Sequence, residues 1–404
     1  MRPPKLTALS LRALAPLALL LAACGGTEDP TPVPTPGDPC ADMISECLVS
    51  QKACVSDSSG AHCAACPPGK YAAASGSCAA IEGKAYSHDF TEFTVAAGEE
   101  VLGKCQSWTI NNPEEIWFNA VELVQDEASH HSNWIFVPDD KFVGPDGVWD
   151  CSDRSYSQLT GALAGGVLYA QSTQAAKEVQ KFPGGAAARI PPYSRIISDI
   201  HLLNVSNAPV TGHANLTIYG LPAADVKVKL TPFHLSYEGL AIPPHATSRF
   251  QGECKVGAQW LGAVGTGFEM KIHYLLPHTH AMATRFFTEI LGGSRDGETI
   301  IDVAGFNGEA RGRSYDPPID MKGSQGFRFG CEYVNERSVE VGWGFGDQEM
   351  CEVLGFAESR AGFEAVVDSA SAAPADGKTQ VFTGACATTA FEWTHDKPGG
   401  PGPK

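Results

Sequence analysis

The sequence is short of positive charge. Its 29 lysines and arginines stand against 46 aspartates and glutamates, which gives a formal net charge of −17 at pH 7. A surface this acidic repels nucleic acid and anionic lipid, so we expect neither as a partner. The apolar run of residues 13–23 is too short to cross a bilayer. No phosphate-binding glycine loop and no serine nucleophile elbow stands out, so the sequence does not indicate a hydrolase.

Long helical periodicities are also scarce. Glycine and proline are frequent, with 43 and 28 residues, and from about residue 84 short apolar runs are separated by Gly, Pro, Asn and Asp. Within runs such as 91–95 and 226–230, apolar and polar residues alternate, which is typical of half-buried strands. We therefore predict an all-β protein.

The length of 404 residues is too great for one ordinary domain. A break at residues 220–225 lies between two strand-like runs and leaves parts of the size of a β-sandwich on either side. We predict two tandem antiparallel β-sandwich domains of jelly-roll-like type, residues 84–222 and 223–396. The Pro- and Gly-rich residues 397–404 are predicted to form a disordered tail.

The N-terminus resembles a bacterial lipoprotein signal peptide, residues 1–23. Arg2, Lys5 and Arg12 accompany the apolar run, and small residues precede Cys24. In a lipobox Cys24 would be acylated and become the new N-terminus. A plain signal peptide with an incidental Cys24 is the alternative.

Removal of the signal peptide would take away three basic residues and no acidic ones, which makes the mature chain still more acidic. Attachment to a membrane would therefore depend on the lipid and not on a basic patch. Residues 24–39 are Pro-rich and predict an extended tether. We expect an exported protein that is lipid-anchored to the cell envelope, at the outer membrane or cell surface of a bacterium.

The chain contains 13 cysteines, and assigning Cys24 to the lipid leaves an even number, which predicts six disulfides in an exported protein. Six of these cysteines fall in one short segment, which would need three disulfides for its stability. These are Cys40, Cys47, Cys54, Cys63, Cys66 and Cys78. Zinc binding by Cys63 and Cys66 is the alternative, but no second pair has zinc-ligand spacing. We predict a disulfide-rich module, residues 40–82, that serves as a spacer or docking element for an unknown partner.

An apolar stretch ends in His278-Thr279-His280. On a regular strand the even-numbered residues from 268 to 280 share one face, and this face is apolar up to the two histidines. The pair would then lie at the end of a core-facing row, about 7 Å apart along the strand. Pro277 indicates an edge or a bulge that would shift this register. A bound metal and ordinary core histidines both remain open as explanations.

Three other stretches contain residue types that bind metals: the adjacent His130 and His131, the isolated His201, and Met350 within the tripeptide Glu-Met-Cys. Together with His278-Thr279-His280, and in this order, they resemble the copper type II, ascorbate-dependent monooxygenases. The resemblance spans about residues 84–390.

The resemblance implies two copper ions per chain. The first, an electron-transfer copper, would be bound by His130, His131 and His201, and the second, the catalytic copper, by His278, His280 and Met350. Imidazole suits both oxidation states of copper, and a thioether favours Cu(I). Ascorbate would supply two electrons, and O2 would hydroxylate a C–H bond of a small-molecule or peptide-like substrate. A non-enzymatic copper carrier on the same scaffold, and a structural surface protein without metal, are the alternatives.

Adjacent residues of a regular strand point to opposite faces, so His130 and His131 could bind one metal only where the backbone is irregular. The resemblance also implies three disulfides, Cys105–Cys151, Cys254–Cys386 and Cys331–Cys351, among the many pairings that spacing alone allows. The last would fix the backbone beside Met350.

Two positions depart from the peptide-amidating members of the family. Leu276 stands where these enzymes carry an arginine that binds the substrate carboxylate, and Leu354 stands where they carry a tyrosine. Neither leucine offers a polar group to a peptide carboxylate. The sequence therefore predicts a more apolar substrate than peptidylglycine.

Overall fold

The computed structural model describes residues 38–126, 129–172, 174–306, 308–344 and 346–395. The predicted signal peptide, the lipidation site Cys24, nearly all of the tether and the tail at 397–404 lie outside these ranges. Among the residues described, no helix is both long enough and apolar enough to span a membrane.

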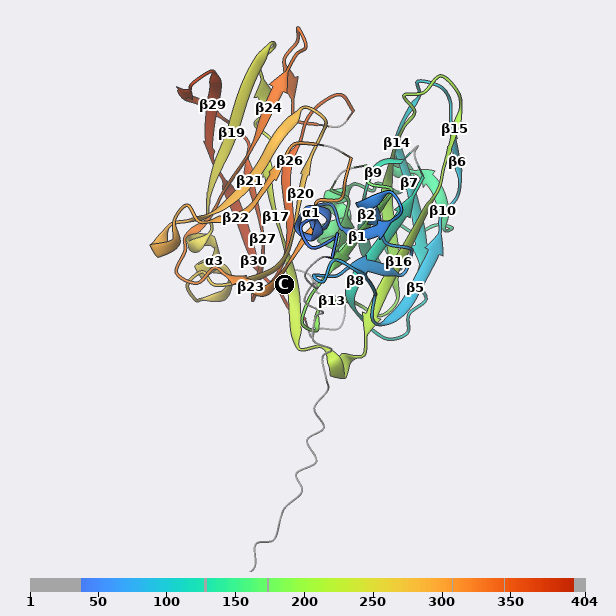
Figure 1. Cartoon of the computed structure of the whole chain (residues 1–404). Helices are drawn as coiled ribbons and strands as arrows, with labels where there is room; N and C mark the ends of the chain where they lie inside the picture. The colour runs from blue at the N-terminus through green and yellow to red at the C-terminus, as the bar shows by residue number, and fades with distance from the viewer. Residues whose placement is uncertain (1–37, 127–128, 173, 307, 345, 396–404) are drawn as a thin grey trace, which may run out of the picture. The chain divides into compact units, whose positions relative to one another are not determined.

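The chain is all-β, as the alternation of apolar and polar residues predicted. Its larger part consists of two β-sandwiches, which we call the first and the second sandwich (Figure 1). The strands of the first precede η2 (Ala223–Asp225) and those of the second follow it. One sheet of the first sandwich runs in the order β10 (Gly147–Asp150), β7 (Glu100–Thr109), β14 (Ser194–Leu203), β9 (Ser129–Pro138) and β11 (Gly166–Ala170). Its other sheet contains β12 (Lys177–Lys181), β13 (Ala186–Ile190), β8 (Ile116–Gln125), β16 (Ala214–Leu221) and β5 (Lys84–Asp89).

The second sandwich is built in the same way. One sheet contains β23 (Arg313–Asp320), β20 (Lys271–Thr279), β26 (Cys351–Glu358), β17 (Val228–Tyr237), β27 (Ala361–Val367) and β30 (Ala387–Glu392). The other runs in the order β22 (Thr299–Ala304), β21 (Ala283–Leu291), β24 (Gly326–Asn335), β19 (Ala246–Lys255), β29 (Thr379–Ala385) and β28 (Ser371–Asp376). Small ladders join β6 (Phe93–Val95) to β15 (Val210–Gly212) and β18 (Ala241–Ile242) to β25 (Val341–Gly342).

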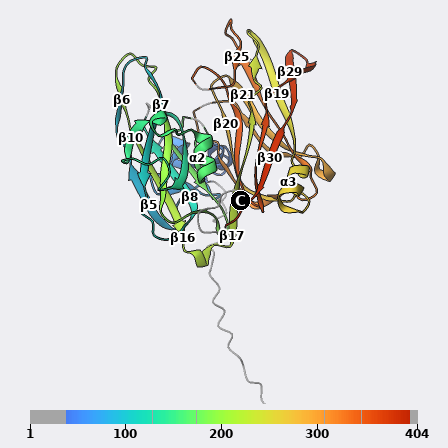
Figure 2. The ribbon, with the colours of Figure 1, turned by 180° about the vertical axis from the view of Figure 1, so that it is seen from behind.

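Helices are few and short among the described residues. They are α1 (Ile44–Val49), α2 (Gln158–Ala164) and α3 (Gly257–Val264), with single turns at η1 (Cys151–Arg154) and η3 (Gly293–Arg295). Helix α2 packs on β9 and β11 of the first sandwich, as the view from behind shows (Figure 2). Its start is capped by Ser157, whose hydroxyl accepts the Thr160 N–H.

The two sandwiches share an apolar interface. The core of the first includes Phe118 and Phe182, and it continues onto β20 and β26 of the second through buried residues such as Phe356. The ring of Phe356 lies 4.9 Å from that of Phe182 and 6.3 Å from that of Phe118, measured between centroids. A two-residue parallel pairing of β13 with β17 also joins the sheets of the two sandwiches.

A β-bulge in β20 overturns one expectation. Ile272 pairs with Ala357 and Tyr274 with Phe356, so His273 is an extra residue. Before the bulge the even-numbered Ile272 lies in the core of the second sandwich, and after it the odd-numbered Leu275 does. The predicted single core-facing row from 268 to 280 is therefore wrong, because the extra residue reverses the alternation of side chains. Tyr274 and Leu276 face the first sandwich instead.

The disulfide-rich module consists of α1 and two hairpins, formed by β1 (Lys52–Asp57) with β2 (Gly60–Ala65) and β3 (Lys70–Ala72) with β4 (Cys78–Ala80). Its disulfides are Cys40–Cys54, Cys47–Cys63 and Cys66–Cys78. Cys63 and Cys66 are thus both in disulfides, which argues against the zinc alternative.

The module is fastened to both sandwiches. In the first, the Glu122 carboxylate accepts the Gly69 N–H at 2.9 Å, and the Gln51 side chain accepts the Val179 N–H at 2.8 Å. In the second, the same Gln51 donates to the Gly312 carbonyl at 2.9 Å. The module therefore docks onto its own chain at the junction of the sandwiches.

We expect Gln51→Asn to lower the stability of the protein by about 1 kcal/mol, the order of the net contribution of a hydrogen bond, because both bonds of Gln51 are only partly buried. Gln51 has a left-handed backbone with a φ of 52°, which asparagine tolerates, but the side chain of asparagine is one methylene too short to reach both partners. The midpoint of urea unfolding measures the effect, with Ser45→Ala on the exposed side of α1 as the control. A midpoint equal to that of the wild type would contradict the bridging role.

Candidate metal centres

The pairing of β20 with β26 brings Met350 to His280. His278 pairs with Glu352 and Thr279 with Cys351, and the next step of this antiparallel register places His280 opposite Met350. Met350 is buried, and its carbonyl accepts the Tyr333 hydroxyl at 2.8 Å. Two segments far apart in the sequence thus meet at one end of the strand pair.

The two imidazoles lie close together. Their ring centroids are 5.2 Å apart, with the ring planes nearly perpendicular. The Nδ1 atom of His278 lies 3.1 Å from the carbonyl oxygen of Ser172 and 3.2 Å from that of Gln171. The Nδ1 atom of His280 lies 2.8 Å from the carbonyl oxygen of Gln348.

A carbonyl oxygen only accepts hydrogen bonds, so the Nδ1 atoms of His278 and His280 are the protonated nitrogens of their neutral rings. Nε2 is then the nitrogen that carries the lone pair in both rings. Histidines that bind metals characteristically donate their second ring N–H to a carbonyl or carboxylate in this way. Burial lowers the pKa of both imidazoles, that of His280 to about 4, so both are neutral at pH 7. The neutral form is the one that binds metals.

Two carboxylates beside this pair had not been predicted. Glu349 is buried and accepts the backbone N–H groups of His280 at 3.1 Å and Met282 at 2.7 Å, which fixes the turn after β20. Burial raises the pKa of Glu349 to about 7. Glu352 lies 3.6 Å from the imidazole of His234. The signal was present in the sequence as the acidic residues that flank Met350-Cys351.

His201, the isolated histidine, is buried on β14 of the first sandwich, and its Nε2 lies 2.7 Å from Oε1 of Glu100. A carboxylate accepts this N–H, so Nδ1 is the nitrogen with the lone pair. Burial lowers the pKa of His201, although the hydrogen bond and charge of Glu100 act in the opposite direction.

The backbone of β9 is irregular at His130 and His131, as the binding of one metal by two adjacent histidines would require. In the pairing of β9 with β14, His131 is opposite His201, whereas Ser129 is opposite Leu202. His130 is therefore an extra residue, and bulges of this kind redirect neighbouring side chains. The side chains of His130 and His131 are not among those described, so their contacts with His201 stay a prediction.

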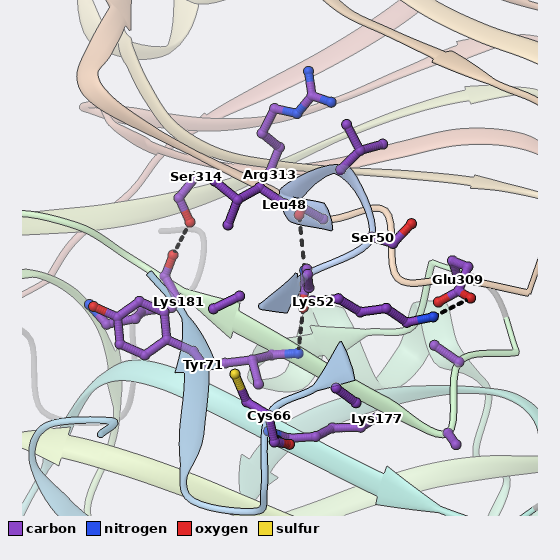
Figure 3. Close-up of a pocket in the computed structure, with 18 of the residues that line it drawn as sticks. Leu48, Ser50, Lys52, Cys66, Tyr71, Lys177, Lys181, Glu309, Arg313 and Ser314 are labelled. Atoms are coloured by element: carbon purple, nitrogen blue, oxygen red, sulfur yellow. Dashed lines mark hydrogen bonds and ion pairs between the residues drawn. The ribbon is translucent and has the colours of Figure 1, made fainter. Parts of the chain in front are cut away.

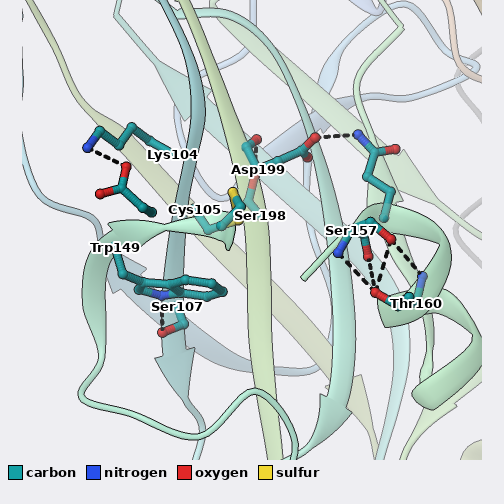
Figure 4. The surroundings of a disulfide bond; sticks show 11 residues. Lys104, Cys105, Ser107, Trp149, Ser157, Thr160, Ser198 and Asp199 are labelled. Atoms are coloured by element: carbon teal, nitrogen blue, oxygen red, sulfur yellow. Dashed lines mark hydrogen bonds and ion pairs between the residues drawn. A yellow bond between two sulfur atoms is a disulfide. The ribbon is translucent and has the colours of Figure 1, made fainter. Parts of the chain in front are cut away.

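The structure forms the disulfides Cys105–Cys151, Cys254–Cys386 and Cys331–Cys351, the pairs that the family resemblance implies. The first joins β7, which carries Glu100, to η1 (Figure 4). The indole of Trp149 lies beside it and donates to the Ser107 hydroxyl at 3.2 Å. The third lies next to Met350 and joins β24 to the start of β26.

Among the described side chains, no three or more of histidine, cysteine, aspartate and glutamate are grouped so that they could hold a metal. The centre predicted from His278, His280 and Met350 contains only two residues of these types. Leu276 and Leu354 are both buried in the interface with the first sandwich, so they fill it with apolar side chains.

A separate cavity of about 800 Å³ lies between the module and both sandwiches (Figure 3). Leu48 and Tyr71 line it from the module, Lys181 from the first sandwich and Arg313 from the second. Lys52 extends along its wall to Glu309, with which it forms an ion pair at 2.6 Å. None of the predicted metal ligands lines this cavity, and the sequence did not predict it.

Comparisons with known proteins add little. No family model matches the chain, and no curated protein matches it significantly. Among solved structures, the major capsid protein P2 of bacteriophage PM2 aligns over 68 % of this chain and 97 % of its own, with 9 % identity and a TM-score of 0.25. The PBSX exported protein XepA aligns over 75 % of this chain and 97 % of its own, with 10 % identity and a TM-score of 0.18. Similarities this weak do not bear on function.

Proposed function

We propose that the protein is a dicopper, ascorbate-dependent monooxygenase that hydroxylates a C–H bond of a small-molecule or peptide-like substrate. One observation carries this proposal. The Nδ1–H groups of His278 and His280 both donate to backbone carbonyls, which leaves Nε2 of each ring as the ligand atom at the strand end that also carries Met350. These hydrogen bonds orient both rings as metal-binding histidines are commonly oriented, which supports the proposal.

In this proposal His278, His280 and Met350 hold the catalytic copper, and His130, His131 and His201 hold the electron-transfer copper. Copper bound by these residues would supply one-electron transfer and O2 activation. One oxygen atom of O2 would enter the C–H bond, and the other would leave as water with two electrons and two protons from ascorbate.

The residues of the chain have distinct tasks in this scheme. Burial keeps the imidazoles of His278 and His280 neutral and therefore able to bind a metal. The disulfide Cys331–Cys351 holds the backbone next to Met350. Leu276 replaces the arginine that binds the substrate carboxylate in the peptide-amidating enzymes that the sequence resembles, so we propose an apolar substrate rather than peptidylglycine.

We further propose that the chain is exported and anchored by a lipid at Cys24. The support is chemical, because six disulfides form and persist in an oxidising compartment outside the cytoplasm.

Copper analysis together with ascorbate-driven O2 uptake tests the function, on a soluble chain that lacks residues 1–38. We expect about two copper ions per chain after reconstitution, as three ligands for each would allow. We also expect O2 consumption that depends on ascorbate. A chain that binds no copper would refute the proposal. A chain that binds both ions but consumes no O2 would favour the copper-carrier alternative.

A further inference from the structure

Glu100 touches both sandwiches. It is the first residue of β7, and its Oε1 atom lies 2.7 Å from Nε2 of His201. Its carboxylate also lies beside the backbone of Gly346, in the connection that leads into β26 of the second sandwich. A Cβ atom on Gly346 would lie 3.3 Å from Oε1 and 3.5 Å from Oε2 of Glu100.

Residues 346–349 also hold His280. The Gln348 carbonyl accepts from Nδ1 of His280 at 2.8 Å, and the Glu349 carboxylate accepts from its backbone N–H at 3.1 Å. The segment itself is tied down, because the Gln348 side chain accepts the Gly342 N–H at 2.8 Å. A short series of contacts therefore leads from His201 through Glu100 to His280.

We infer that Glu100 is a positioning residue that serves both metal centres, an inference that rests on the proposed copper function. At the first centre its carboxylate holds the N–H of His201, which directs the other ring nitrogen, Nδ1, to the metal. At the second it packs against the segment that carries the partners of His280. Glu100 is thus a contact between the sandwiches that touches the surroundings of both centres.

Two features of Gly346 agree with this role. Its φ is +66°, in the left-handed region that favours glycine, and an added side chain would crowd the Glu100 carboxylate. Glu100 itself is about one-third exposed at its side chain, so its removal leaves no buried charge in the first sandwich. Changes at either residue can therefore alter the centres without unfolding the protein.

The test compares Glu100→Ala, Glu100→Gln and Gly346→Ala in the soluble chain, by Cu(II) titration and by electron paramagnetic resonance of the loaded protein. We expect Glu100→Ala to weaken binding at the first centre about 10–100-fold and to change its spectrum, as loss of a partner that orients a ligand does. Glu100→Gln keeps an oxygen that accepts the His201 N–H and should restore most of the affinity. Gly346→Ala should change the signals of both centres.

Glu99→Gln is the matched control, because the Glu99 side chain accepts the N–H of Ala96, away from the centres. If the wild type binds two copper ions and Glu100→Ala binds them with unchanged affinity and spectrum, the inference is wrong and the proposed function stands. If the wild type binds no copper, the proposed function is wrong, and the inference about Glu100, which rests on it, is wrong as well. If the Gly346→Ala variant had wild-type signals at both centres, the contact of Glu100 with Gly346 would not link the two centres.

Discussion

Replacing His280 with alanine is expected to lower the copper content from about two ions per chain to about one and to abolish ascorbate-driven O2 uptake. The imidazole of His280 is buried, neutral and oriented by the Gln348 carbonyl, so in the proposed function its loss removes a preoriented copper ligand. Even the loss of a residue that only orients a metal ligand lowers metal affinity about 10–100-fold. The loss of a ligand itself should lower the affinity further, so we expect the second centre to be empty at micromolar copper concentrations.

Copper analysis and an O2 electrode measure these effects. His62→Ala is the control, because His62 is an exposed histidine of the disulfide-rich module that belongs to neither centre. Met350→Ala should also impair O2 uptake while the first copper stays bound. If His280→Ala retained both ions, or if Met350→Ala emptied both centres, the division of the ligands between two centres would be wrong.

Replacing Glu122 with alanine should destabilise the protein by about 3–5 kcal/mol, the cost of removing one partner of a buried ion pair. The side chain of Glu122 is only 3 % exposed and lies 3.0 Å from the Lys177 ammonium group. It also accepts the Gly69 N–H and, at 2.9 Å, the Tyr219 hydroxyl. Its loss would remove the carboxylate partner of Lys177, of the Gly69 N–H and of the Tyr219 hydroxyl, while Lys177 would keep its hydrogen bonds to the module carbonyls of Cys66, Pro67 and Lys70.

Urea unfolding with the disulfides intact measures this change. Glu122→Gln keeps one acceptor oxygen and should lose less stability than Glu122→Ala. Limited proteolysis should cut the alanine variant first near residue 82, where the module joins the first sandwich, because the undocked linker becomes accessible. Equal midpoints for the wild type and Glu122→Ala would show that the module is held by other contacts.

The sequence could not reveal which face of β20 carries the histidines. The alternation of residues 268–280 correctly indicates a strand, but it places His278 in a core-facing row. The bulge at His273 reverses that alternation and turns His278 toward the first sandwich, where Nδ1 reaches the Ser172 carbonyl. A bulge depends on how two strands pair, and the pairing partner, β26, lies far along the chain.

The same limit applies to the module. Its cysteine spacing indicated three disulfides and little core of its own. Its attachment through Gln51 and Glu122 to the two sandwiches joins residues that are 53, 128 and 261 positions apart in the sequence. Nothing in the local composition marks Glu122, which is one of three polar residues, with Asn119 and Gln125, in an otherwise apolar strand.

By itself the sequence determined the all-β class, the disulfide-rich module and the residue types of the candidate centres. The class and the module follow from composition, from the period of two along a strand and from an even number of cysteines, all of which are local or countable. The residues of the candidate centres follow from the order of short motifs that resemble those of a known family. Only the tertiary structure decided that Thr279 pairs with Cys351, next to His280 and Met350, that Glu100 lies between His201 and Gly346, and that His278 faces the first sandwich. Such contacts depend on the register of strands that are distant in the chain, and a register is set by packing across the whole fold.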